Sequence, residues 1–434
     1  MGPVRAIRER EAPRRRADVR RTLLILVVVG LVLRVAWWWI AHPEPVSDFL
    51  GYRSIAERLV HAGEYSRGGV TTAFRTPGYP AFLGLGILVW DSDRWLSLLN
   101  VAVSTTAIPL TAWFAHELGL GRRVSVASAA LVALIPTFVL WAPVLASEHL
   151  QVALALVAWS LSCRTTSWRR AAGAGAVFGI AVLVRPESIF FLLAVPLLLR
   201  VARVDRRRIL PLAAVTIATA GLVVAPWYLR NELVVGRGTG LSTSGGLNFY
   251  LAHRADGYRF VEPALTPLRG LDEIATNREG YALGLRTIRS DPARLVSTTL
   301  RYTYELFRAP TYAAHYSTRR DGVTPYRSTV PHPAVETAKG VATAGWVVTL
   351  VLVPVGIVGL WLGGRRRAFG ALGALLAANW LCFTVVFWGM PRYRYAVEPV
   401  LAILAAVGLT VLRDRLTVDT DSPGSSETDV IQIA

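Results

Sequence analysis

Several charged side chains that could perform chemistry stand at the ends of apolar segments of this sequence. Asp48 follows the first apolar segment, and Glu148 stands with His149 between two later ones. The other members of the set hold comparable positions: Arg75, Arg185, Glu187, Arg230, Arg392, Tyr393 and Arg394. Carboxylates can act as general bases or bind hard cations, and arginines present planar forks to phosphate oxygens. The set therefore suits the transfer of a group away from a phosphate.

Each of these residues also has an ordinary structural interpretation. Asp48 could cap a helix that begins at "SDFLGYRSIAERLV". Glu148 and His149 could lie in a solvated turn, while Arg185 and Glu187 could simply pair with each other. Arg75 could brace the turn at "RTPGYP", and the run Arg392, Tyr393 and Arg394 could form an aromatic–arginine belt at a membrane interface.

The composition predicts a membrane protein. The chain has 434 residues, of which 53% are hydrophobic and 18% are charged. Soluble proteins carry about 25% charged residues, and a helix of about 20 apolar residues crosses a bilayer. The net charge of +18 comes largely from arginine clusters between the apolar segments, as the positive-inside rule requires. This distribution argues against nucleic-acid binding.

The apolar segments predict an all-α polytopic fold of about ten transmembrane helices, with both termini in the cytoplasm. Residues 22–41 form a retained signal anchor, because the segment is too long for a signal-peptide core. The apolar segment 78–90 is too short to span, which favours a re-entrant or interfacial helix. The predicted spans are 22–41, 96–118, 124–141, 150–163, 172–184, 188–200, 209–227, 341–362, 368–389 and 395–412.

This topology divides the chain into parts. A basic cytoplasmic segment, 1–21, precedes an N-terminal transmembrane module, 22–227, which contains a first external loop at 42–95. A long external region, 228–340, leads to the C-terminal helices at 341–412 and a disordered cytoplasmic tail at 413–434. Within the external region, the sequence of residues 290–307 predicts a helix capped by Ser290 or Asp291. Its mixed aromatic and arginine faces suit the membrane surface. All the candidate residues then share the external face of the membrane.

Six stretches of the sequence carry a resemblance to a known family. They are "SDFLGYRSIAERLVHAGEYS", "RTPGYPAFL", "ASEHL", "APWYLRNELVVGR", "STSGGLNFYLAH" and "MPRYRYAVEPVL". Together they resemble the GT-C membrane glycosyltransferases, and especially the bacterial relatives of protein O-mannosyltransferases and of the lipid A aminoarabinose transferase. The resemblance covers about residues 22–412. It implies a GT-C-like fold with external juxtamembrane helices.

The resemblance also implies roles for four residues. The acid in the first external loop of that family is the catalytic base, and Asp48 matches its position. A second external acid, which binds metal or substrate, matches Glu148. Basic residues near the last external turn contact the donor phosphate, and they match Arg392 and Arg394.

We therefore expect a glycosyltransferase of the cytoplasmic membrane with its active site on the external face. It would move a sugar from a polyprenyl phosphate to an extracytoplasmic lipid, glycan or protein acceptor, with inversion. Asp48 would deprotonate the acceptor, and Asp48, Glu148 and His149 are the candidate ligands of a divalent metal. No organic cofactor is expected, and the expected partners are the lipid-linked donor, membrane lipids and the acceptor.

Two alternatives remain open at this stage. A transporter or flippase of a lipid-linked sugar would place charged groups near mid-membrane and carry inverted repeats. A catalytically inactive membrane assembly factor would keep the fold without the chemistry.

Overall fold

The structure is a computed structural model that describes residues 3–254, 265–320 and 327–420. The N-terminal half contains α1 (Pro3–Ala41), α2 (Asp48–Ala62), β1 (Ser66–Arg67), β2 (Val70–Thr71), α3 (Gly78–Val89), α4 (Asp93–Glu117), α5 (Arg122–Leu134), α6 (Pro136–Trp141), α7 (Glu148–Cys163), α8 (Trp168–Val184), η1 (Pro186–Ala194), α9 (Val195–Val201) and α10 (Arg206–Arg230). The C-terminal half contains η2 (Asn231–Val235), α11 (Ser244–His253), η3 (Thr266–Leu268), α13 (Glu273–Ser290), α14 (Ala293–Leu306), α15 (Tyr312–Ser317), β3 (Arg319–Arg320), β4 (Arg327–Ser328), α16 (His332–Leu362), α17 (Arg366–Trp380), η4 (Leu381–Val386), η5 (Pro391–Val397) and α18 (Glu398–Thr420).

The predicted fold class is confirmed. Apart from two antiparallel hairpins, β1–β2 and β3–β4, the described chain is helical. Six helical stretches are long and apolar enough to cross a membrane, and each contains or overlaps a predicted span: 18–41, 93–117, 206–235, 332–362, 366–386 and 391–416. The chain is therefore a multi-pass membrane protein.

The other predicted spans correspond to shorter helices. Residues 124–141 form α5 and α6, 150–163 lie in α7, 172–184 lie in α8, and 188–200 are divided between η1 and α9. A proline begins α6 and another begins η1, where a missing backbone N–H is tolerated at a first turn. The count of ten crossings stays a prediction.

Glycines let the long helices approach closely. In α16, a Cβ on Gly356 would lie 1.9 Å from the carbonyl oxygen of Leu404 in α18. In return, a Cβ on Gly408 of α18 would lie 2.3 Å from the carbonyl oxygen of Leu352. Such backbone contact through small residues is the usual packing of membrane helices.

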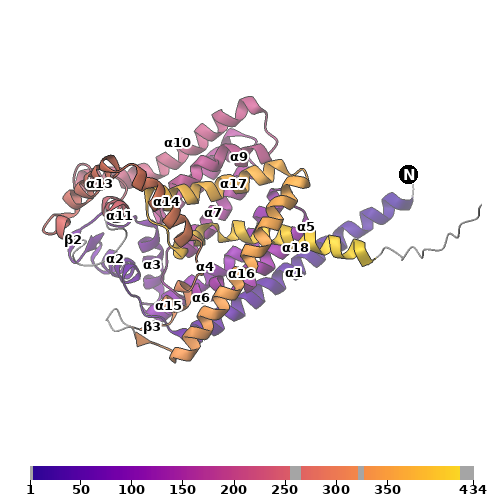
Figure 1. Cartoon of the computed structure of the whole chain (residues 1–434), viewed down its shortest axis with the longest axis horizontal. Helices are drawn as coiled ribbons and strands as arrows, with labels where there is room; N and C mark the ends of the chain where they lie inside the picture. Colours follow the sequence, from indigo (N-terminus) through magenta and orange to yellow (C-terminus); the bar gives the residue numbers. More distant parts are fainter. Residues whose placement is uncertain (1–2, 255–264, 321–326, 421–434) are drawn as a thin grey trace, which may run out of the picture.

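The ends of the chain and its polar elements lie on opposite sides of the molecule. Figure 1 shows α2, α11 and α13 gathered at the left, while the N-terminus and the end of α18 lie at the right. This arrangement agrees with the predicted separation of external loops from cytoplasmic termini. The predicted tail needs a correction, because α18 continues to Thr420 and residues 413–420 are helical; residues 421–434 lie outside the described chain.

The predicted helix at 290–307 corresponds to α14. The carboxylate of Asp291 accepts a hydrogen bond from the backbone N–H of Arg294 at 3.2 Å, so Asp291 is its cap. Val296, Leu300 and Tyr304 recur every four residues and are exposed. An exposed apolar stripe of this kind suits a helix that lies on a membrane surface.

Candidate active site

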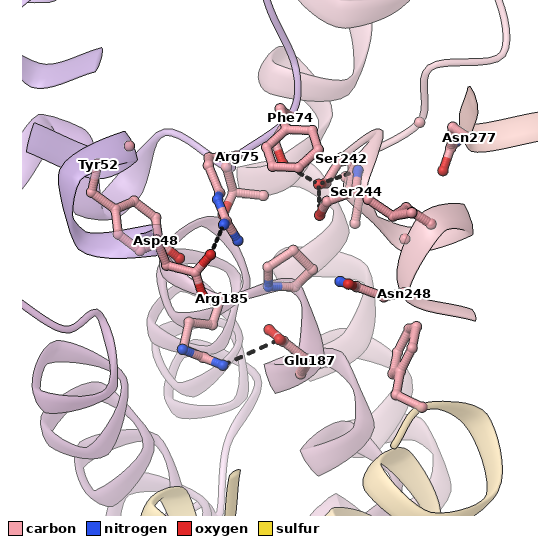
Figure 2. Close-up of a pocket in the computed structure, with 18 of the residues that line it drawn as sticks. Asp48, Tyr52, Phe74, Arg75, Arg185, Glu187, Ser242, Ser244, Asn248 and Asn277 are labelled. Carbon is pink, nitrogen blue, oxygen red and sulfur yellow. Dashed lines mark hydrogen bonds and ion pairs between the residues drawn. The ribbon is translucent and has the colours of Figure 1, made fainter. Parts of the chain in front are cut away.

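A cavity of about 1100 Å³ lies among α2, η1, α11, α13 and η5 (Figure 2). It collects residues that are separated by more than 340 positions in the chain. Six of the sequence-predicted site residues line it, namely Asp48, Arg75, Arg185, Glu187, Arg392 and Tyr393. The cavity is thus the place where the predicted external set comes together.

Asp48 is the first residue of α2, immediately after a sharp turn. Ser47 has φ 53° and ψ −121°, a backbone conformation that L-residues rarely adopt. Such strain persists only where the surrounding structure holds it, and it is common at functional sites. The Asp48 carboxylate accepts hydrogen bonds from Arg75 and, at 3.4 Å, from Arg392. It therefore engages guanidinium groups, and helix capping does not account for its position.

Arg75 approaches Asp48 from the loop between β2 and α3. Tyr65 fixes that loop, because its hydroxyl donates to the carbonyl oxygens of Arg75 and Thr76 at 2.9 and 3.1 Å. The Arg75 guanidinium lies 5.1 Å from the ring centroids of both Tyr52 and Phe74. These contacts aim the side chain at the Asp48 carboxylate, as Figure 2 shows.

Glu148 is buried and does not line the cavity, but it contacts two arginines that do. It is the first residue of α7, and its carboxylate accepts from Nε of Arg392 and pairs with Arg185 at 3.0 Å. Arg185 also pairs with Glu187 at 3.3 Å and donates to the Ser147 hydroxyl at 3.0 Å. Glu148 is therefore the anchor for two of the arginines that face the cavity.

These contacts form one row of alternating charge. Its order is Arg75, Asp48, Arg392, Glu148, Arg185 and Glu187. Three guanidinium groups balance three carboxylates, so the row is neutral as a whole. Exposure of the carboxylate side chains rises from 2% at Glu148 to 24% at Glu187 and 37% at Asp48. Asp48 is consequently the carboxylate that is most open to a substrate.

The neighbouring arginines keep Asp48 ionised. Burial raises the pKa of the Asp48 carboxyl, but the charges of Arg75 and Arg392 and the Arg75 hydrogen bond outweigh burial and lower it below the usual value. A carboxylate with a low pKa is a weak proton acceptor. Its basicity would rise if another anion drew the arginines away.

Arg394 lies outside the cavity, although it is two residues from Arg392. Its guanidinium donates to the carbonyl oxygens of Leu306 and Arg308, at the end of α14, and lies 3.5 Å from the Trp346 ring centroid. It also pairs with Glu398 at 3.5 Å. These contacts give Arg394 a structural position, and its side chain does not line the cavity.

Arg230 and His149 also point elsewhere. Arg230 donates to the carbonyl oxygens of Thr72 and Tyr65 at 2.8 and 3.3 Å, and so ties the β1–β2 hairpin to the end of α10. The His149 ring nitrogens face the Trp141 carbonyl oxygen at 3.1 Å and the Tyr395 hydroxyl at 3.3 Å. Neither side chain lines the cavity.

Comparison with known proteins identifies the architecture. Residues 75–229 match the family model of dolichyl-phosphate-mannose-protein mannosyltransferases. The oligosaccharyltransferase of Archaeoglobus fulgidus, solved with a tethered acceptor peptide containing the NVT sequon, superposes with a TM-score of 0.53 at 15% identity. The match covers 92% of this chain and 50% of the archaeal one. The chain has the GT-C fold.

The likeness to solved structures extends to the fold but not to close sequence similarity. The chain spans about half the length of the archaeal oligosaccharyltransferase, for which a second structure, with Zn and sulfate, gives a TM-score of 0.52 at 16% identity. ArnT of Cupriavidus metallidurans, solved with undecaprenyl phosphate, gives a TM-score of 0.43 at 15% identity, over 92% of this chain and 79% of that one. None of the curated proteins matches the sequence. The likeness to the archaeal oligosaccharyltransferase confirms, at the level of fold, the GT-C architecture predicted from the six sequence stretches.

The predicted metal ligands of this GT-C chain do not converge. Asp48 and Glu148 are each held by two guanidinium groups, and the ring of His149 faces Trp141 and Tyr395. Over residues 3–254, 265–320 and 327–420, no three His, Cys, Asp or Glu side chains are grouped as an ion would require. A divalent cation at Glu148 would have to displace two arginines. The donor set, as it stands, does not fit a metal ion.

Two walls of the cavity escaped the sequence analysis. One is polar and neutral, and it comes from α11, α13 and the loop before α11: Ser242, Ser244, Asn248 and Asn277. The other is apolar: Ile189, Phe190, Phe383, Phe387, Trp388 and Met390. The signal for the polar wall was the pair of glycines Gly246 and Gly280. A Cβ on Gly280 would lie 2.4 Å from the carbonyl oxygen of Gly246, so these glycines bring α11 against α13.

Proposed function

We propose that this chain is a membrane glycosyltransferase that moves a sugar from a polyprenyl phosphate to an extracytoplasmic acceptor, with inversion of configuration. The observation that carries the proposal is the row of alternating charge, which presents the Asp48 carboxylate beside Arg75 and Arg392 in one cavity. A carboxylate and two guanidinium groups lie together there, and they suit the roles of a base and of phosphate-binding groups in the displacement of a phosphate by a hydroxyl.

The two sides of the cavity suit the two ends of such a donor. Arg75, Arg185 and Arg392 present guanidinium forks that match phosphate oxygens. The apolar wall, which includes Phe190, Phe383 and exposed Ile189, offers a surface for the prenyl chain. A lipid phosphate could therefore place its headgroup on the charged row and its tail along the aromatic side chains.

The proposed reaction is a single displacement. Asp48 takes the proton of the acceptor hydroxyl, and the oxygen forms a bond to the anomeric carbon from the face opposite the phosphate. The bond between that carbon and the phosphate oxygen breaks, and its electron pair leaves with the phosphate. Charge-assisted hydrogen bonds from the arginines stabilise this leaving group, so no strong general acid is needed.

Donor binding would also prepare the base. In the free protein, Arg75 and Arg392 hold Asp48 and keep its pKa low. A phosphate anion competes for the same guanidinium groups, and each one that turns to the phosphate relieves Asp48 of a positive neighbour. The pKa of Asp48 then rises toward the range in which a carboxylate is a useful base. Buried Glu148 holds Arg185 and Arg392 in place for this exchange.

The proposal places the active site outside the cytoplasmic membrane and both termini inside. The arginine clusters between the helices support this orientation, since basic loops stay in the cytoplasm. A reporter fused after residue 280 should then read as external, and one fused after residue 366 as cytoplasmic. Cytoplasmic placement of the first fusion would contradict the external active site.

The Asp48→Asn variant tests the proposed chemistry. Purified variant and wild type would be given a labelled polyprenyl-phosphate sugar and membrane-derived acceptors, and sugar transfer and donor binding would both be measured. We expect transfer to fall by about 100-fold or more, the range for a general base, while donor binding is largely kept. Asp93→Asn is the matched control, because Asp93 also begins a helix and pairs with an arginine, at 2.7 Å, but does not line the cavity.

The outcomes separate this proposal from its rivals. Normal transfer by Asp48→Asn would show that Asp48 is not the base. A flippase would move the donor across liposomes without forming any glycoside, whatever residue occupies position 48. An assembly factor would bind no donor and transfer no sugar in the wild type.

A further inference from the structure

Three exposed arginines stand at the mouth of the cavity. Arg67 belongs to β1, Arg237 to the loop after η2, and Arg278 to α13, and all three line the cavity. Their segments are separated by up to about two hundred residues in the chain. We call these three residues the arginine rim.

The arginine rim has no carboxylate partner among the described residues. Arg67 lies over the Phe74 ring, 4.8 Å from its centroid, and no ion pair within 4.0 Å reaches any of the three guanidinium groups. Glu232, whose field reaches Arg237, accepts instead from the backbone N–H groups of Gly238 and Gly240 at 2.8 and 2.9 Å. The rim therefore carries three positive charges that no carboxylate of the described residues approaches within 4.0 Å.

Two other exposed arginines in this part of the molecule are paired locally. Arg286 pairs with Glu279 on α13, and Arg308 pairs with Glu305 at 2.9 Å just beyond α14. In these two cases a glutamate nearby in the sequence balances the charge of the arginine. The rim differs because its guanidinium groups face a cavity.

Two carboxylates fix the segments that carry the rim. Glu273, the first residue of α13, accepts from the Thr72 hydroxyl at 2.7 Å and from the backbone N–H of Ala73 at 2.8 Å. It also accepts from the Thr243 hydroxyl, just before α11. Glu273 thus joins the hairpin loop, the segment before α11 and α13, while Glu232 holds the loop that carries Arg237, so the backbone segments of the rim are preorganised.

Below the rim, the polar wall offers groups that suit neutral sugar hydroxyls. The Ser242 and Ser244 hydroxyls lie 2.9 Å apart, and Asn248 and Asn277 extend the same wall, across the cavity from Asp48 (Figure 2). The Ser242 hydroxyl donates to the carbonyl oxygen of Phe74, and the Asn277 side-chain oxygen accepts from the backbone N–H of Gly246. The remaining donors and acceptors of the wall suit sugar hydroxyls, since hydroxyl and amide groups both donate and accept.

We infer that the arginine rim and the polar wall form an acceptor subsite for an anionic glycan. The inference rests on the proposed glycosyltransferase function. The charged row below is already neutral, and a donor phosphodiester brings about one negative charge. Balancing the donor therefore uses about one of the three rim charges, and an acceptor that carries carboxylate or phosphate groups would match the other two.

Binding of two labelled probes tests the inference directly. The purified full chain in detergent would be titrated with a fluorescent galacturonic acid tetrasaccharide and with the neutral galactose tetrasaccharide. We expect the acidic probe to bind more tightly, and its affinity to fall as salt rises, since exposed charges are screened over about 10 Å at 0.1 M salt. Arg237→Gln and Arg278→Gln should each weaken acidic binding by about 2-fold to 5-fold, the range for exposed charge pairs.

Arg289→Gln is the matched control, because Arg289 is exposed on the same helix, α13, and does not line the cavity. Equal binding of both probes, or an equal effect of Arg289→Gln, would overturn the inference. So would rim variants that lose only binding to phosphatidylglycerol vesicles, because the rim would then face lipid headgroups. Failure here leaves the Asp48→Asn test of sugar transfer untouched, so the two proposals fail separately.

Discussion

Arg392 and Arg394 lie two residues apart in η5 and have opposite surroundings. Arg392 faces the cavity, where it reaches Asp48 at 3.4 Å and also pairs with Glu148. Arg394 is buried on the other side, where it holds the end of α14 and Glu398. A 3₁₀-helix has three residues per turn, so residues i and i+2 point in different directions. The comparison separates an arginine that serves a substrate site from one that serves the fold.

The largest expected effect is on stability, at Arg394. Arg394→Ala removes the partner of buried Glu398 and two hydrogen bonds to α14. Breaking a buried ion pair costs about 3–5 kcal/mol, so we expect a large fall in the temperature of thermal unfolding. Replacing both partners, as Arg394→Met with Glu398→Leu, should restore much of that loss, because no unpaired charge is left. An unchanged unfolding temperature for Arg394→Ala would show that Arg394 does not stabilise the fold.

Arg392 should show the reverse pattern. Arg392→Gln leaves Glu148 paired with Arg185 at 3.0 Å, so the fold should be largely kept. Binding of a polyprenyl phosphate should weaken by about 10-fold to 150-fold, because a charge-assisted hydrogen bond contributes about 1.5–3 kcal/mol. Arg392→Lys should recover only part of the binding, since an ammonium group cannot form the bidentate fork. Donor binding and thermal unfolding would be measured together. A variant that lost stability but kept donor binding would show that Arg392 is purely structural.

The same contrast shows what the sequence could and could not predict. Arginine clusters and apolar lengths located most of the membrane helices, because both follow from the properties of the bilayer. The position of Asp48 at the end of the first span also indicated a site residue, and Asp48 lines the cavity. The sequence could not distinguish Arg392 from Arg394, or Glu148 from His149, because side-chain direction within one turn depends on tertiary packing.

The polar wall was missed for a different reason. Ser242, Ser244, Asn248 and Asn277 are neutral residues from two helices, and only the packing of α11 against α13 brings them together. Gly246 and Gly280 mark the close approach of the two helices, but nothing in the sequence shows that these two glycines face each other. The arginine rim was missed likewise, because its members come from segments that only the fold places around one opening.

A smaller effect is expected at Arg75, on the pH dependence of transfer. Arg75 lowers the pKa of Asp48, so Arg75→Gln should raise that pKa. The base form is then lost at a higher pH, and kcat/KM should begin to fall earlier as the pH decreases. Arg230→Gln is the control, because Arg230 braces the hairpin and does not line the cavity. Identical acid limbs for both variants would mean that Arg75 does not act on the base.

The wild type should show a related difference between two pH profiles. The profile of kcat/KM reports the free protein, and the profile of kcat reports the substrate complex. If the donor phosphate draws Arg75 and Arg392 from Asp48, the acid limb of kcat lies at a higher pH than that of kcat/KM. Coincident limbs would contradict the competition between phosphate and Asp48.

The smallest effect is expected at His149, the neighbour of Glu148. Its ring faces the Trp141 carbonyl and the Tyr395 hydroxyl, so it serves local packing and neither the charged row nor a cation. His149→Gln keeps a hydrogen-bonding group in the same place, and we expect a loss of stability of about 1 kcal/mol, the size of one hydrogen bond, with transfer nearly unchanged. Transfer by wild type and variant would be compared with and without EDTA. If His149 were a ligand of a required metal, the variant would lose transfer at low metal and recover it as metal was added. The same response to EDTA in both proteins is the expected result, because the two ring nitrogens of His149 are directed away from Asp48 and Glu148.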